Sequence, residues 1–143
     1  MSPLQSNEVS AARDRPTSER PAARSAMVVD DDTTAALVVE RVLGRRGIEV
    51  LKVPQSFGVM NRIARHRPSL VLLDVKMPGL DGPTLVTLIR QDPEIARTRI
   101  VLYSALAIDA LAQTAGECGA DGFIAKSLGL LHLERSLELY LGR

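Results

Sequence analysis

Polar residues stand at the ends of four short apolar runs in this sequence, and their types suggest one kind of chemistry. They are Asp30, Asp31 and Asp32, then Asp74, Ser104 and Lys126. Clustered carboxylates repel one another, and a hard divalent cation such as Mg²⁺ relieves that repulsion. A carboxylate beside such an ion can attack phosphorus, while an ammonium and a hydroxyl neutralise and orient the phosphoryl oxygens. The set therefore indicates phosphoryl transfer onto an aspartate.

The apolar runs themselves predict a parallel sheet. Five segments read as buried strands: 26–29, 50–53, 70–75, 100–103 and 122–125. Continuous apolar runs are typical of strands covered on both faces, which means a parallel sheet between two layers of helices. Ligands of such sheets bind beyond the carboxyl ends of the strands. The polar residues at those ends are therefore expected to converge on one crevice.

The segments between the runs carry helical patterns. Thr33 or Thr34 is expected to cap the first helix, which Gly47 ends. The remaining helices are predicted over 57–66, 83–91, 108–117 and 130–141. Leu130, Leu133, Leu137 and Leu141 lie along one side of the last. The sequence thus predicts five strand–helix units.

Composition excludes several classes of protein. The 143 residues are 45% apolar and 24% charged, with a net charge of +1, so bulk charge favours neither nucleic acid nor a membrane as partner. The single cysteine, Cys118, cannot form an internal disulfide, and no apolar run approaches the roughly 20 residues of a membrane span. We expect a cytoplasmic protein with a disordered tail over residues 1–24 and one domain over residues 25–143.

Four stretches resemble the receiver domains of response regulators. They are the run from Ala26 to Asp32, the run from Val71 to Gly82, the run from Val101 to Ala105 and the run from Gly119 to Lys126. Ser104 and Lys126 also follow Asp74 by 30 and 52 residues, which are the intervals of this family. The resemblance covers about residues 25–141. It implies an α/β fold of the flavodoxin-like, doubly wound (βα)5 type, with helices on both faces of a five-stranded parallel sheet of strand order 2-1-3-4-5.

The resemblance also implies a role for each matching residue. Asp74 is the expected phosphoacceptor, and Ser104 and Lys126 are expected to contact the phosphoryl group. Mg²⁺ (or Mn²⁺) would be held by Asp31 directly, by Asp30 through water, by Asp74 and by the backbone carbonyl of Lys76. Ser104 and Phe123 would act as the switch, although Phe123 fits a plain core position equally well.

One position departs from the family pattern. Ser127 follows Lys126, where many receiver domains have a proline after a cis peptide bond. A cis bond to serine would cost about 3 kcal/mol, so the sequence leaves the turn after Lys126 open.

The resemblance implies a stand-alone switch in a two-component system. The phosphodonor would be a histidine kinase or a histidine phosphotransfer protein, and the output would be a changed protein-interaction surface on the fourth helix, fifth strand and fifth helix. The chain would catalyse only its own phosphoryl uptake and loss. A homodimer, a relay position between two histidine proteins and a phosphorylation-independent binding module remain open alternatives.

Two other functions fit less well. A phosphatase with an aspartyl nucleophile needs a second aspartate two residues later, where this chain has Lys76. A flavodoxin-type electron carrier needs a phosphate-binding loop after the first strand, where Asp30, Asp31 and Asp32 would repel a phosphate.

Overall fold

A computed structural model describes residues 24–142, which form five strands and five α-helices in alternation. The strands are β1 (Ser25–Val29), β2 (Glu49–Val53), β3 (Leu70–Leu73), β4 (Ile100–Ser104) and β5 (Gly122–Ala125). The helices are α1 (Thr33–Gly44), α2 (Val59–His66), α3 (Gly82–Gln91), α4 (Ile108–Cys118) and α5 (Gly129–Leu141). Every predicted element is present, and most bounds differ by one or two residues, which is the usual uncertainty of element ends.

The strands form one parallel sheet in the predicted order β2-β1-β3-β4-β5. In the centre of the sheet, Met27 of β1 pairs with Leu51 on one side and with Val71 on the other. Strands β1, β3 and β4 are buried almost throughout, as their continuous apolar runs predict.

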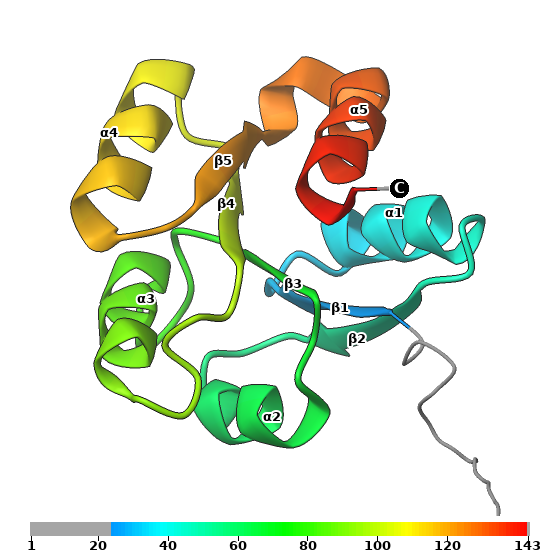
Figure 1. The fold of residues 1–143 in the computed structure, drawn as a ribbon. Coiled ribbons are helices and arrows are strands. Elements are labelled where there is room, and N and C mark those ends of the chain that lie inside the picture. Colours follow the sequence, from blue (N-terminus) through cyan, green and yellow to red (C-terminus); the bar gives the residue numbers. More distant parts are fainter. Residues whose placement is uncertain (1–23, 143) are drawn as a thin grey trace, which may run out of the picture.

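Each face of the sheet has its own hydrophobic core. Side chains of α2, α3 and α4 pack against one face, and those of α1 and α5 pack against the other, as Figure 1 shows. Successive residues of a strand point to opposite faces, so each central strand contributes to both cores. Leu73 of β3 belongs to the first core and Leu72 to the second.

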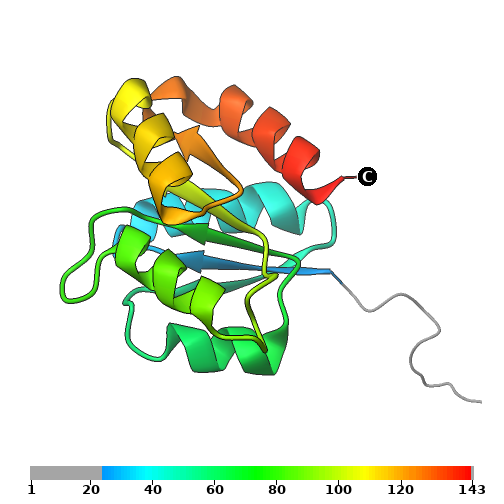
Figure 2. The ribbon, with the colours of Figure 1, turned by 60° about the vertical axis from the view of Figure 1, so that its left-hand side comes forward.

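Parallel pairing brings the carboxyl ends of the strands to a common edge. Figure 2 shows this edge on the left, where loops leave the sheet, while β1 begins and α5 ends at the opposite edge. There, the guanidinium of Arg24 donates a hydrogen bond of 2.6 Å to the carbonyl oxygen of Leu141. Arg24 is the one residue of the predicted tail within the described range. No helix within residues 24–142 is long and apolar enough to cross a membrane.

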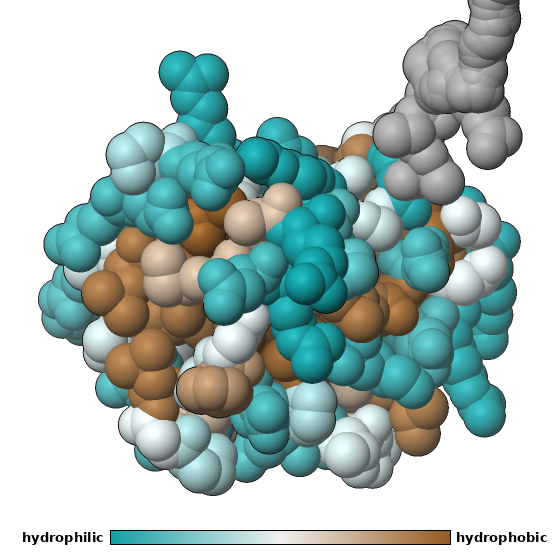
Figure 3. Space-filling model, turned by 90° about the horizontal axis from the view of Figure 1, so that it is seen from below, coloured by the Kyte–Doolittle hydropathy of each residue, from teal (hydrophilic) through white to brown (hydrophobic). Residues whose placement is uncertain are grey.

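Helix α2 begins later than predicted. The sequence placed Phe57 inside the helix, but the helix starts at Val59 and Phe57 lies outside it with 84% of its surface exposed. The reason is Gly58, whose φ of 79° is left-handed and interrupts helical geometry. The outward positions of α2 are polar, among them Arg62 and Arg65. Figure 3, the view from below, shows a hydrophilic band across this face with apolar side chains on both sides.

The cap of α1 also corrects a prediction. Neither Thr33 nor Thr34 is the N-cap, because both lie within the helix. Asp32 takes that position, and its carboxylate accepts hydrogen bonds from the amides of Thr34 and Ala35 at 3.0 and 3.2 Å. Of the three consecutive aspartates, the third therefore caps the amino end of α1.

Helix α5 buries only part of its leucine side. Leu133 and Leu137 are buried in the core, whereas Leu130 remains 53% exposed. Leu130 lies in the first turn of α5. The helix follows a short 3-10 turn, Lys126–Leu128, and the described residues contain no cis peptide bond. The peptide bond between Lys126 and Ser127 is thus trans, and Ser127 lies in the 3-10 turn.

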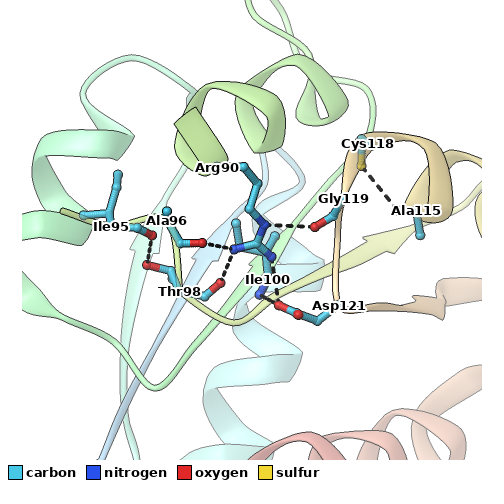
Figure 4. A network of polar contacts seen from close by, with 9 residues as sticks. All are labelled: Arg90, Ile95, Ala96, Thr98, Ile100, Ala115, Cys118, Gly119 and Asp121. Atoms are coloured by element: carbon cyan, nitrogen blue, oxygen red, sulfur yellow. Dashed lines mark hydrogen bonds and ion pairs between the residues drawn. The ribbon is translucent and has the colours of Figure 1, made fainter. Parts of the chain in front are cut away.

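The guanidinium of Arg90 connects two loops at the amino edge of the sheet, the α3–β4 loop and the α4–β5 loop. Arg90, at the end of α3, donates four hydrogen bonds of 2.7 to 2.9 Å (Figure 4). The acceptors are the carbonyl oxygens of Ala96, Thr98 and Gly119 and the carboxylate of Asp121. Asp121 also accepts the amide of Ile100 at 2.8 Å. This network fixes where β4 and β5 begin, and hence where they end at the opposite edge.

Replacing Arg90 with methionine should therefore destabilise the fold by about 2 kcal/mol, because carbonyl groups of two loops lose a charged donor. Arg97→Met changes an exposed arginine in the loop between α3 and β4; it is the matched control and should change stability by less than about 0.5 kcal/mol. Urea denaturation of both variants measures the difference. Equal stability losses would show that Arg90 acts only as a surface residue.

Candidate functional site

Four strand ends bring the predicted residues to one place. Asp30 directly follows β1 and Asp74 directly follows β3. Ser104 is the last residue of β4, and Lys126 directly follows β5. Backbone pairing continues beyond β3, where the amide of Asp74 donates to the carbonyl of Val29 at 2.9 Å. The sheet ladder thus places Asp74 beside the aspartates that follow β1.

Three carboxylates form a compact acidic group. One carboxylate oxygen each from Asp30, Asp31 and Asp74 lie within 4.8 Å of one another. Asp30 and Asp74 are buried, and Asp31 is exposed. Two carboxylates of the group are therefore buried and one is exposed to solvent. A ligand could enter the site from the exposed side.

The ammonium of Lys126 faces this group. Its Nζ lies 2.8 Å from Oδ2 of Asp30 and 3.9 Å from Oδ2 of both Asp32 and Asp74. The contact with Asp30 is an ion pair without hydrogen-bond geometry, and that buried oxygen has no hydrogen-bond partner. Such an acceptor remains available to a cation or a donor that enters the site.

Burial raises the pKa of Asp74, and the negative charge of Asp30 raises it further. The charge of Lys126, the amide of Val75 and the hydroxyl of Ser104 act in the opposite direction. The amide of Val75 donates to Oδ1 of Asp74 at 2.8 Å. The balance of these effects disfavours the charged carboxylate, so a nearby positive charge would stabilise it.

Ser104 is almost fully buried beside Asp74, and its hydroxyl oxygen accepts the amide of Leu106 at 3.3 Å. The side chain of Lys76 is exposed two residues after Asp74. Phe123 is half-buried on β5 and packs against the core on the α4 side. Phe123 thus lies near the site edge but outside the polar group.

Gly82 supports the site without a side chain. A Cβ at this position would collide with the backbone carbonyl oxygen of Asp74. The amide of Gly82 donates to the carbonyl of Val75 at 2.9 Å, which closes the loop after β3. From the sequence, Gly82 is assigned no role of its own. Its place directly before Pro83, which lies in the first turn of α3, was the available signal.

The acidic group fits a hard divalent cation. All three side chains offer oxygen ligands, which Mg²⁺ and Mn²⁺ prefer. The buried Oδ2 of Asp30 has no hydrogen-bond partner, and a metal or its bound water could satisfy it. The donor set is therefore compatible with the cofactor that the sequence predicts.

Comparison with known proteins identifies the family. Residues 26–138 match the response regulator receiver domain. The chain belongs to this family. Receiver domains are signalling modules of two-component systems, and they typically bind Mg²⁺ at an acidic pocket.

Individual relatives agree with this assignment. The receiver domain is 20% identical to the polar-differentiation response regulator DivK of Brucella anthropi over 119 residues, which are 83% of this chain and 97% of DivK. It is 31% identical to the BeF3-activated N-terminal receiver domain of Klebsiella pneumoniae RstA, with a TM-score of 0.74, covering 84% of this chain and all of that one. Chemotaxis protein CheY4 of Vibrio cholerae shares the fold at 22% identity and a TM-score of 0.74, over 84% of this chain and 100% of CheY4.

Proposed function

We propose that this receiver domain accepts a phosphoryl group on Asp74 with Mg²⁺ (or Mn²⁺) as cofactor. The observation that carries the proposal is the convergence of an acidic group, an ammonium and a buried hydroxyl from four strand ends. A stand-alone acidic cluster could bind a metal, but it would need neither Lys126 nor Ser104. Their presence beside Asp74 favours a site that must also hold phosphoryl oxygens.

The proposed reaction is a displacement at phosphorus. A carboxylate oxygen of Asp74 forms a bond to phosphorus while the bond between phosphorus and the histidine nitrogen of the donor protein breaks. The electron pair of the broken bond stays on that nitrogen. Lys126 and Ser104 contact the phosphoryl oxygens and offset their charge. A bound Mg²⁺ would reduce repulsion between the carboxylates and the incoming phosphoryl group. The groups that would hold it are Asp30, Asp31, Asp74 and the backbone carbonyl of Lys76.

The proposed donor is a histidine kinase or a histidine phosphotransfer protein, and the proposed output is a protein-binding face. The proposed face consists of α4, β5 and α5, and apolar side chains exposed on it support the proposal. Ile108 of α4, Leu139 of α5 and Leu128 of the 3-10 turn between β5 and α5 are exposed, and they line a cavity of about 490 Å³ with Phe123. A change at Ser104 that moved Phe123 would alter this cavity, for a protein target or for a second copy of the chain.

Metal removal tests the proposed function. Wild-type protein with Mg²⁺ and acetyl phosphate should gain an acid-stable, base-labile adduct, and an excess of EDTA should reduce labelling to background because the carboxylates then repel the phosphodonor. Intact-mass spectrometry before and after alkali measures the adduct. A protein that gains no adduct with Mg²⁺, or gains as much in EDTA, would refute the proposal.

A further inference from the structure

Tyr103 lies under the ammonium of Lys126. The Nζ of Lys126 is 5.3 Å from the centroid of the Tyr103 ring, within the range of a cation–π interaction. Tyr103 is only 7% exposed, and it directly precedes Ser104 on β4. The structure thus places the Tyr103 ring against a residue of the candidate site.

The register of the sheet explains the contact. Tyr103 of β4 pairs with Ile124 of β5, and both belong to the core under α1 and α5. Lys126 follows Ile124 by two residues, directly after β5 ends, and its Nζ lies over the Tyr103 ring. Tyr103 and Lys126 are thus diagonal neighbours, a spacing that an aromatic ring and a long side chain can bridge.

The surroundings keep this ring neutral. Burial raises the pKa of Tyr103 to about 12, with further contributions from the charges of Asp30 and Asp32. A phenol is protonated throughout the physiological range even at its ordinary pKa of 10, and the raised value only widens that margin. The ring therefore offers Lys126 an uncharged π face, and not a phenolate that would add to the negative charge of the site.

Lys126 needs such support because several groups compete for it. Its flexible stem carries a compact ammonium with three donors, and carboxylates lie at 2.8 Å and at 3.9 Å on the side of the acidic group. A cation–π contact attracts the ammonium without using any of its N–H donors. Those donors stay available for phosphoryl oxygens.

We propose that Tyr103 is a positioning residue, whose ring holds the Lys126 ammonium at the edge of the acidic group where the phosphoryl group arrives. This inference rests on the proposed function and deepens it. It assigns the role to the ring and not to the hydroxyl, so loss of the ring and loss of the hydroxyl should have different effects.

Two substitutions and one control test the role. The initial rate of adduct formation is measured against acetyl phosphate concentration, with saturating Mg²⁺. Tyr103→Leu should lower the maximal rate roughly 2- to 30-fold. Tyr103→Phe keeps the ring and should stay within about twofold of wild type. Val101→Ala removes volume from the same strand and the same core, so it should lower the melting temperature but leave the rate unchanged. Equal rates for Tyr103→Leu and wild type, or an equal loss in Val101→Ala, would overturn the inference.

A second measurement does not depend on phosphoryl uptake. In protein with labelled lysine, the ε-methylene protons of Lys126 should show an upfield ring-current shift, kept in Tyr103→Phe and lost in Tyr103→Leu. Uptake without this shift in wild type would refute the inference alone. The shift without any uptake would refute the proposed function, and with it the role of Tyr103 in that reaction.

Discussion

Replacing Asp74 with asparagine should reduce formation of the base-labile adduct to background, because an amide oxygen cannot form an acyl phosphate. Asp74 is the buried carboxylate that Lys126 and Ser104 both approach. The control is Asp109→Asn, which neutralises an exposed aspartate on α4 and should label as wild type does. Intact-mass spectrometry after acetyl phosphate and Mg²⁺ compares the two. Equal labelling of Asp74→Asn and wild type would place the phosphoryl group elsewhere.

The same variant should be more stable than wild type at pH 7 in EDTA. Burial and then the charge of Asp30 raise the pKa of Asp74 above its ordinary value of 3.8. The folded state therefore binds this proton more tightly than the unfolded state does. The resulting stability is complete below the ordinary pKa and is lost as the pH rises through the raised one. Asparagine does not titrate, so its advantage in urea denaturation should shrink as the pH falls toward 4, and an advantage for wild type at pH 7 would contradict this account.

Replacing Lys126 with methionine should destabilise the fold by about 3 kcal/mol in EDTA, because the buried Asp30 and Asp74 then lack their nearest positive charge. The same change should slow adduct formation, since the phosphoryl oxygens lose a cation. Added Mg²⁺ should recover most of the stability but not the rate. Urea denaturation with and without Mg²⁺ measures the first effect.

The chain provides a matched ion pair as the control. Lys52 and Glu40 lie at the same N–O distance of 2.8 Å as Lys126 and Asp30, but their side chains are 40% and 41% exposed. The side chains of Lys126 and Asp30 are 16% and 1% exposed. Lys52→Met should therefore cost no more than about 1 kcal/mol and should not respond to Mg²⁺. Similar losses in both variants would mean that burial does not set the strength of the Lys126 pair.

Most of the sheet, and the edge at which the site residues lie, can be predicted from residue patterns in the sequence. Buried parallel strands leave long apolar runs, and a single charge at the end of such a run, as at Asp74, is conspicuous. The strand ends then meet because parallel pairing allows little else. This is why the residues at the carboxyl edge could be predicted before their distances were known.

The features that the sequence did not predict depend on backbone angles and register. Asp32 and Thr33 are both good caps by type, and only the backbone conformation decides that Asp32 is the cap. Phe57 fits a helical pattern, but the left-handed Gly58 excludes it from α2. The contact between Tyr103 and Lys126 requires the pairing of β4 with β5, which residue types alone do not give.

Gly82 has a consequence for how this site can vary. Any side chain at position 82 would collide with the main chain of Asp74, so the proposed phosphoacceptor constrains this position although Gly82 contributes no functional group. Designers who exchange the loop between β3 and α3 can alter its exposed residues, such as Lys76 and Pro78, but must keep glycine as the first residue of α3. A search for divergent or engineered versions of this site should therefore weight position 82 as a residue of the site itself.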